Sequence, residues 1–168
     1  LISFFLVLAV YARYTDENDT YRERYRQEVH PATTADIFEE LSLNKEPSIR
    51  KRVASNRKTP KRILLHLASD PSHAVKIALA TNLSAPDDVF LILARDPAVA
   101  VRSVAARFEY VPVAALEILA TDKDVDIRLE VARNLNTTKN ILHKLTKDSN
   151  NAVRAIAEQA VQRLTEDL

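Results

Sequence analysis

The sequence of 168 residues contains no glycine, no cysteine, no methionine and no tryptophan. A phosphate-cradling loop of the Rossmann or P-loop type depends on glycine, so nucleotide binding through such a loop is excluded. A β protein built on tight turns is disfavoured for the same reason. The lack of cysteine excludes disulfides, iron–sulfur clusters and zinc sites with cysteine ligands. The net charge of +1 gives no overall indication of a nucleic acid or an anionic surface as partner.

What the chain does contain is one pattern that returns at a constant interval. A basic residue marks each return, at Arg50, Lys76, Arg102, Arg128 and Arg154, which defines a 26-residue period. An aliphatic residue precedes each of them, an Asn or Asp lies six residues before, and in four of the five cycles an alanine follows after four residues. A fixed period of 20–50 residues is typical of stacked structural repeats.

Each cycle predicts two short helices. The run 60–68 begins with proline, which suits a first helical turn, and its apolar residues share one face. The run 48–55 likewise places its aliphatic residues and alanine on one face. Neither helix buries its apolar face alone, whereas stacked neighbours do, and the recurring alanine permits close approach. We therefore predict an all-α fold, a right-handed α-solenoid of about five 26-residue two-helix repeats.

The turn after the second helix raises the question of what replaces glycine there. Asparagine, the best non-glycine residue for a left-handed helix cap, recurs at Asn56, Asn82 and Asn134. We predict that these residues turn the chain in a left-handed conformation. Phe108 takes the same place in the third cycle, so we expect that cycle to turn differently.

The chain divides into three regions according to how well each part matches the 26-residue pattern. Residues 1–15 are strongly apolar but too short to span a bilayer, which needs about 20 residues. We interpret them as a partial membrane anchor; an apolar capping helix or a signal-peptide remnant are the alternatives. Residues 16–44 fit the repeat only in part and are predicted to be a divergent N-terminal capping unit. Residues 45–168 carry the repeats, and the pattern breaks near residue 158, which predicts a polar C-terminal cap.

The recurring basic residues invite two interpretations. A row of arginine and lysine at a constant interval could follow a phosphate backbone. However, a second row lies six residues earlier, and its last four members are Asp70, Asp96, Asp122 and Asp148. In a stack the two rows lie side by side, and charge-assisted hydrogen bonds between neighbours would fix the register. We therefore predict a structural role for this ladder, with the aspartates also accepting from the N–H groups that open the next helix.

These residues resemble a known family. The phrase D-x-x-x-x-(V/I)-(R/K)-x-x-(V/L)-A-x-N, followed by P-x-x-(I/L)-L-x-x-L-A-x-D, is similar to the leucine-rich repeat variant (LRV) family of bacterial proteins. It is also similar to HEAT repeats, which share an Asp and an Arg six residues apart. The resemblance covers about residues 31–164 and implies short helical pairs stacked into a right-handed superhelix. The cysteine-bound iron–sulfur cluster of a founding LRV protein does not transfer, because cysteine is absent.

The HEAT resemblance also implies which helix lines the concave side, namely the one that bears the basic residue. Positions one and five after that residue then point outward. These positions, which we call the concave strip, are Lys51, Ser55, Ile77, Thr81, Ser103, Arg107, Leu129 and Arg133. The strip mixes aliphatic, hydroxyl and basic side chains, which suits a protein partner with some acidic character. It has no aromatic platform for stacking bases, which argues against single-stranded nucleic acid.

A second candidate surface is the basic cluster. Residues 45–70 carry eight basic and two acidic residues, whereas residues 1–44 carry four basic and eight acidic ones. Apart from the ladder residue, the cluster consists of Lys51, Arg52, Arg57, Lys58, Lys61 and Arg62. It suits anionic lipid headgroups, nucleic acid or an acidic protein. The alternative is a solvated face that Glu39 and Glu40 partly neutralise.

The sequence offers no catalytic or metal constellation. No G-x-S-x-G or HExxH motif occurs, and the four histidines are scattered. Pairs of acids such as Asp124 and Asp126 lie at expected helix starts, where they favour the helix dipole. We predict no enzymatic activity, no catalytic or metal-binding residue and no cofactor.

These observations favour a non-enzymatic scaffold that binds another protein, as an accessory subunit of a membrane-associated assembly. Residues 1–15 would contact the membrane, and the repeats would lie in an aqueous compartment on the cytoplasmic side; the alternative is a soluble cytoplasmic protein. The rival function is a HEAT-like module that binds nucleic acid through the basic cluster.

Overall fold

A computed structural model describes residues 31–166, and this part of the chain is entirely helical. Its ten helices are α3 (Pro31–Ser42), α4 (Pro47–Ser55), α5 (Lys61–Leu67), α6 (His73–Ala80), α7 (Asp87–Leu93), α8 (Val99–Arg107), α9 (Val113–Leu119), α10 (Val125–Arg133), α11 (Lys139–Leu145) and α12 (Asn151–Glu166). Residues 31–166 contain no strand, which confirms the predicted all-α class.

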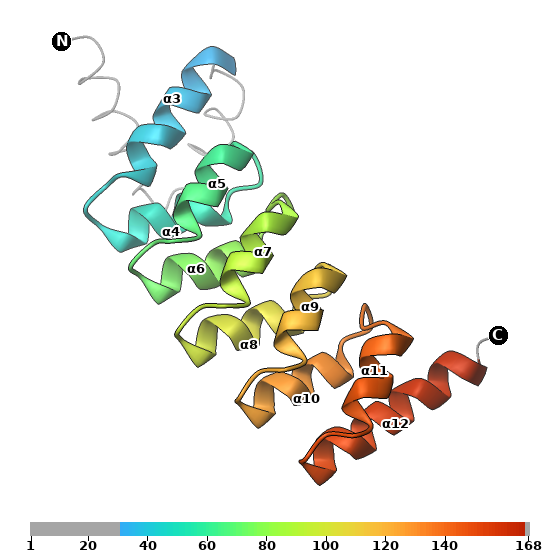
Figure 1. Cartoon of the computed structure of the whole chain (residues 1–168). Helices are drawn as coiled ribbons and strands as arrows, with labels where there is room; N and C mark the ends of the chain where they lie inside the picture. The colour runs from blue at the N-terminus through green and yellow to red at the C-terminus, as the bar shows by residue number, and fades with distance from the viewer. Residues whose placement is uncertain (1–30, 167–168) are drawn as a thin grey trace, which may run out of the picture.

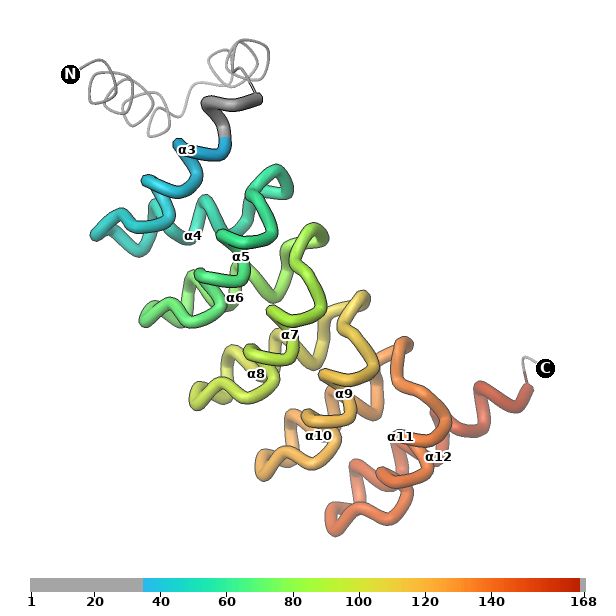
Figure 2. The backbone as a smooth tube through the Cα atoms, turned by 45° about the horizontal axis from the view of Figure 1, so that its top comes forward, coloured from blue at the N-terminus to red at the C-terminus, as the bar shows by residue number. Residues whose placement is uncertain are grey.

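The helices follow one another along a single row, with α3 and α12 at opposite ends (Figure 1). The even-numbered helices α4 to α12 pack each against the next, and α3, α5, α7 and α9 do the same. Each odd-numbered helix also contacts the even-numbered helix that follows it. The loops from even to odd helices therefore lie along one edge of the row, and the loops from odd to even helices lie along the other (Figure 2).

One continuous core runs between the two layers. The aliphatic residue before each ladder residue is buried, as are the recurring alanines Ala54, Ala80, Ala106 and Ala132. A side chain as small as alanine lets helix axes approach to the lower end of the usual 8–10 Å range. The apolar period read from the sequence thus places the correct residues in the core.

The turns at the asparagines differ from the prediction. None of the non-glycine residues between 31 and 166 has a positive φ, so no left-handed cap is present in this part of the chain. Asn56 and Asn134 end α4 and α10 with extended backbone, at φ/ψ of −82°/121° and −68°/127°. Phe108 ends α8 in the same conformation, at −65°/132°, so the third cycle turns like the first and the fourth. In the second cycle α6 ends instead at Thr81, at −108°/3°. An extended residue after the helix reverses the chain without glycine, which explains how the sequence dispenses with it.

The N-terminal predictions lie largely outside the described residues. The proposed anchor at 1–15 and the first part of the capping unit at 16–44 are not described. Of that unit, α3 packs against α4 and α5, and its Phe38 and Leu41 are buried in the core. Within residues 31–166, no helix has the length and the apolar character that crossing a membrane requires.

The C-terminal helix is the longest in the row, with 16 residues against seven to twelve in the others. Its first half repeats the buried pattern through Val153 and Ala157, and Ala160 is also buried. From residue 162 to residue 166 every side chain is exposed. The helix therefore covers the last core layer with its first turns and presents exposed, mostly polar residues beyond it.

Candidate functional site

The ladder of basic and acidic residues lies at the edge formed by the loops from odd to even helices. Arg102 Nε lies 2.6 Å from Asp122 Oδ2, and its Nη2 donates to Asp122 Oδ1 at 3.1 Å. Arg50 with Asp70 and Arg128 with Asp148 form the same bidentate pair. The side chains of Arg102 and Asp122 are only 6% and 7% exposed. The prediction that the ladder links neighbouring repeats is confirmed.

The pairing partner is the acid of the next repeat, 20 residues after the arginine, rather than the acid six residues before it. The earlier residue contributes its backbone instead: Arg102 Nη1 donates to the carbonyl of Asp96 at 2.7 Å. Each aspartate in turn accepts a backbone N–H two residues later, as Asp122 does from Asp124 at 2.9 Å. One arginine therefore ties together two successive loops, and the ladder is a structural cross-link.

Hydrogen bonding sets the ionisation of these aspartates. Burial by itself raises the pKa of Asp70 and Asp122. The hydrogen bond from Arg50 or Arg102, the hydrogen bond from a backbone N–H and the neighbouring positive charges together lower the pKa by more. The hydrogen bond from Arg128 is the largest influence on the pKa of Asp148. The pKa of all three carboxyls therefore lies below its ordinary value, because the charged form is the one that the ladder stabilises.

Acid should consequently destabilise the fold. A carboxyl whose pKa is lower in the folded than in the unfolded chain contributes stability above the unfolded pKa of about 4, and this is lost as the pH falls through the folded pKa. We expect the free energy of unfolding to fall from pH 5 downward, with a smaller slope in Asp122→Asn. Urea unfolding between pH 6 and pH 2.5 measures both slopes. Identical slopes would contradict this assignment of Asp122.

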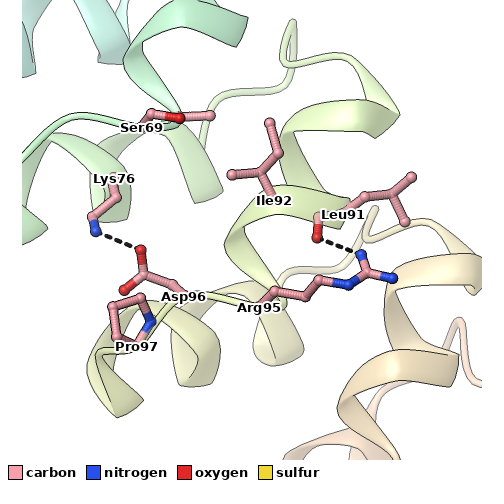
Figure 3. A pocket seen from close by; sticks show the side chains of 8 residues that line it. Ser69, Lys76, Leu91, Ile92, Arg95, Asp96 and Pro97 are labelled. Carbon is pink, nitrogen blue, oxygen red and sulfur yellow. Dashed lines mark hydrogen bonds and ion pairs between the residues drawn. The ribbon is translucent and has the colours of Figure 1, made fainter.

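The second step of the ladder differs because it carries lysine. Lys76 Nζ bonds to Asp96, whereas Arg102 makes four hydrogen bonds. An open pocket of about 580 Å³ lies beside this step (Figure 3). Arg95 also lines it, but its Nη1 donates to the carbonyl of Leu91 at 2.9 Å. The charged groups of the pocket are thus engaged with the protein, and the pocket holds no nucleophile paired with a base.

The asparagines form a second set of cross-links, which the sequence did not reveal. Asn82 Nδ2 donates to the carbonyls of Ala54 at 2.6 Å and Asn56 at 3.2 Å, both in the preceding repeat. Its Oδ1 accepts from the N–H of Ser84 at 2.8 Å. Asn134 reaches the carbonyls of Ala106 and Phe108 in the same way. The recurrence of asparagine reflects its amide, which both donates and accepts, rather than its tolerance of a left-handed backbone.

The concave strip lies on the solvent side of the even-numbered helices. Lys51, Ser55, Thr81, Arg107 and Arg133 are exposed. Ile77, Ser103 and Leu129 are half-buried, and Ile77 and Leu129 also pack against the core. The structure therefore leaves these side chains accessible, fully or in part, along one layer of helices.

The basic cluster is divided among α4, the loop after it and the start of α5. Lys51 lies on the exposed side of α4, whereas Arg57 and Lys58 lie in the loop after it and are exposed. Arg62, at the start of α5, forms an ion pair with Glu39 of α3 at 2.6 Å, as the alternative interpretation expected. Lys61, also at the start of α5, is exposed, so the positive charge that a partner could reach comes from α4, the loop and the first turn of α5.

The histidines and the capping acids are the other candidates for chemistry among residues 31–166. His66, His73 and His143 are exposed on three different helices. Asp124 caps α10, where its Oδ1 accepts from the N–H of Asp126 at 2.9 Å, which confirms the predicted capping role. Between residues 31 and 166, no group of three or more histidine, aspartate or glutamate side chains is placed to hold a metal ion. No family model matches the sequence, and no curated protein matches it.

Proposed function

We propose that the chain is a non-enzymatic scaffold that binds another protein along the exposed side of its even-numbered helices. The observation that carries the proposal is that one set of polar side chains is hydrogen-bonded between repeats, whereas another set stays accessible to solvent. The ladder and the asparagines are committed to cross-links between repeats, whereas the concave strip keeps side chains accessible along successive helices. The exposed side chains of the strip differ from repeat to repeat, whereas the buried and cross-linking residues recur. Such a surface suits recognition of an extended partner.

The proposal also includes a specific arrangement of the helices. We propose a right-handed α-solenoid of about five 26-residue repeats, of the LRV or HEAT-like kind. The layered row of helices and the contact of each even-numbered helix with the next support it. The bidentate pairs between each arginine and the acid of the following repeat, which recur with the period, support it as well.

The rival function, nucleic-acid binding through the basic cluster, has less support. Phosphate contacts depend on several cations aligned on one surface. Arg62 is paired with Glu39, and the other cations are divided among α4, the loop after it and the start of α5. We therefore favour a protein partner.

Affinity capture with the full chain as bait tests the proposal. We expect Thr81→Arg combined with Ser103→Arg to lower recovery of the captured protein about tenfold or more, because both side chains lie on the strip and a long charged group obstructs docking. Ala114→Arg, on the exposed side of α9, serves as the matched control and should leave recovery unchanged.

Circular dichroism establishes that all three proteins are folded alike. Two outcomes oppose the proposal. Unchanged capture by the strip variant would remove the strip as the binding surface. Capture that nuclease treatment abolishes would instead favour the nucleic-acid module.

A further inference from the structure

The edge opposite the ladder carries a row of exposed apolar side chains. We call it the loop edge and define it as residues 55–60, 81–86, 107–112 and 133–138. Leu83, Tyr110 and Leu135 are 47%, 63% and 76% exposed there. Leu83 and Leu135 lie two periods apart, so they occupy the same place in their loops. The three side chains therefore come from three successive loops of this edge, at 81–86, 107–112 and 133–138. Figure 1 shows the order of these loops along the row of helices.

The ladder edge provides the comparison. Its loops between repeats, at 68–72, 94–98, 120–124 and 146–150, expose no large apolar side chain. The exposed large apolar side chains next to these loops or at the end of the row are Val99, at the start of α8, and Leu43, in the loop after α3. Single exposed apolar residues are ordinary on protein surfaces, but exposed apolar side chains on three successive loops of one edge are a feature to be explained. The aromatic member of the row is also held in place. Phe108 stacks on Phe90 with ring centroids 5.4 Å apart, and Tyr110 packs edge-on against Phe108 at 5.9 Å.

Positive charge accompanies the apolar row. The loop edge contains four basic residues, Arg57, Lys58, Arg107 and Arg133, against the single acid Glu109. All four basic side chains are exposed. Arg133 has Glu130 at 4.0 Å, which is a long contact. Apolar anchors surrounded by cations are complementary to a partner that presents apolar residues among acids.

We infer that the loop edge docks an acidic amphipathic helix of a partner protein. This inference rests on the proposed function, that the chain is a protein-binding scaffold, and adds a docking surface and the chemistry of the partner. The loop edge adjoins the concave strip and shares Ser55, Thr81, Arg107 and Arg133 with it. Packed helices lie about 8–10 Å apart, so successive loops follow at a similar interval. A helix returns to the same face after seven residues, a rise of about 10.5 Å. A β-strand is a poorer match, because residues three apart, at about 10 Å, point to opposite faces.

A designed peptide serves as the probe. It is a labelled three-heptad helix with one leucine per heptad in an otherwise glutamate- and alanine-rich sequence. We expect it to bind the full chain, and we expect Leu83→Ser combined with Leu135→Ser to weaken binding about tenfold or more, from lost burial of two leucines. Arg107→Glu with Arg133→Glu should weaken binding too and reduce its dependence on salt. Fluorescence anisotropy at two salt concentrations measures these effects.

Matched controls show whether binding depends on the loop edge and on the spacing of leucines in the peptide, rather than on amino-acid composition alone. Leu65→Ser, on the exposed side of α5, should leave peptide affinity unchanged. A peptide of the same composition with leucines five residues apart should bind about tenfold more weakly or worse, because its leucines no longer share a face. The exposed positions chosen for substitution should change stability by no more than about 0.5 kcal/mol, so folding is preserved.

Several results would overturn the inference. The first is that the peptide does not bind, and the second is that Leu83→Ser combined with Leu135→Ser leaves its affinity unchanged. The third is that the peptide with leucines five residues apart binds equally well. The fourth is that an acidic polyproline peptide with leucine at every third position binds more tightly. Sedimentation that shows a dimer lost in the serine variant would assign the edge to a second copy of the chain. If the strip variant loses its captured protein while the peptide fails to bind, only this inference fails and the proposed function stands.

Discussion

Replacing Arg102 by alanine is expected to lower the free energy of unfolding by about 3–5 kcal/mol. The substitution leaves the carboxylate of Asp122 buried without its cation, and removing one partner of a buried ion pair costs about this much. It also removes the donor to the carbonyls of Asp96 and Pro97. For a chain of this length the melting temperature should fall on the order of 10 °C. Urea and thermal unfolding, followed by circular dichroism, measure both quantities.

The matched control is Arg62→Ala, which removes an ion pair whose side chains are 61% and 52% exposed. Exposed pairs contribute about 0–1 kcal/mol, so this variant should unfold almost like the wild type. Arg102→Met combined with Asp122→Leu should regain part of the lost stability, because no charge is then left unpaired. Arg102→Ala should not alter partner affinity once the protein is folded. Unchanged melting together with lost binding would reverse the structural assignment of the ladder.

Replacing Asn82 by glycine distinguishes the two roles considered for asparagine. A left-handed cap would tolerate glycine or gain from it, because glycine adopts positive φ without strain. The structure instead places the Asn82 amide in a buried link to the carbonyls of Ala54 and Asn56. We therefore expect Asn82→Gly to lower the free energy of unfolding by about 2–4 kcal/mol. The loss combines an unpaired buried carbonyl, at about 1–3 kcal/mol, with the added flexibility of glycine.

Asn82→Ala separates these two contributions, because it removes the amide without adding the backbone freedom of glycine. It should cost about 1–3 kcal/mol, somewhat less than the glycine variant. Asn140→Ala, at an exposed position of α11, controls for the loss of an asparagine as such and should be nearly neutral. Equilibrium unfolding in urea measures all three variants. A glycine variant as stable as the wild type would restore the left-handed cap as the explanation of the recurrence.

The apolar period predicted the helices and their buried faces because helix formation and burial are local consequences of spacing. Positions three and four residues apart share a helix face wherever the helix lies, so Val53 and Ala54 could be assigned to the core before any contact was known. The ladder was predicted as a link between neighbours for a similar reason, since two rows with one period remain adjacent in a stack. The pairing of each arginine with the acid of the following repeat was not predicted, because the sequence does not give the direction in which a long side chain reaches.

The asparagine turns were predicted wrongly because two physical properties of asparagine fit the same pattern. Tolerance of positive φ and an amide that donates and accepts are both properties of Asn82, and only the backbone angles and the neighbouring carbonyls distinguish them. The exposed row at Leu83, Tyr110 and Leu135 was missed although its spacing was available. Loop residues were expected to be accessible, and the contrast between the two edges appears only when the loops are assembled in space.

By itself, the sequence determined that residues 31–166 form helices, that their core repeats with the 26-residue period, and that no glycine- or cysteine-dependent site exists. These follow from side-chain periodicity and from residues that are simply absent. The tertiary structure alone decided which acid each arginine binds, what the asparagines hold together, and that cations and apolar side chains meet on one edge. Such contacts join residues 20 to 28 positions apart, and their geometry depends on how neighbouring helices pack rather than on any local pattern.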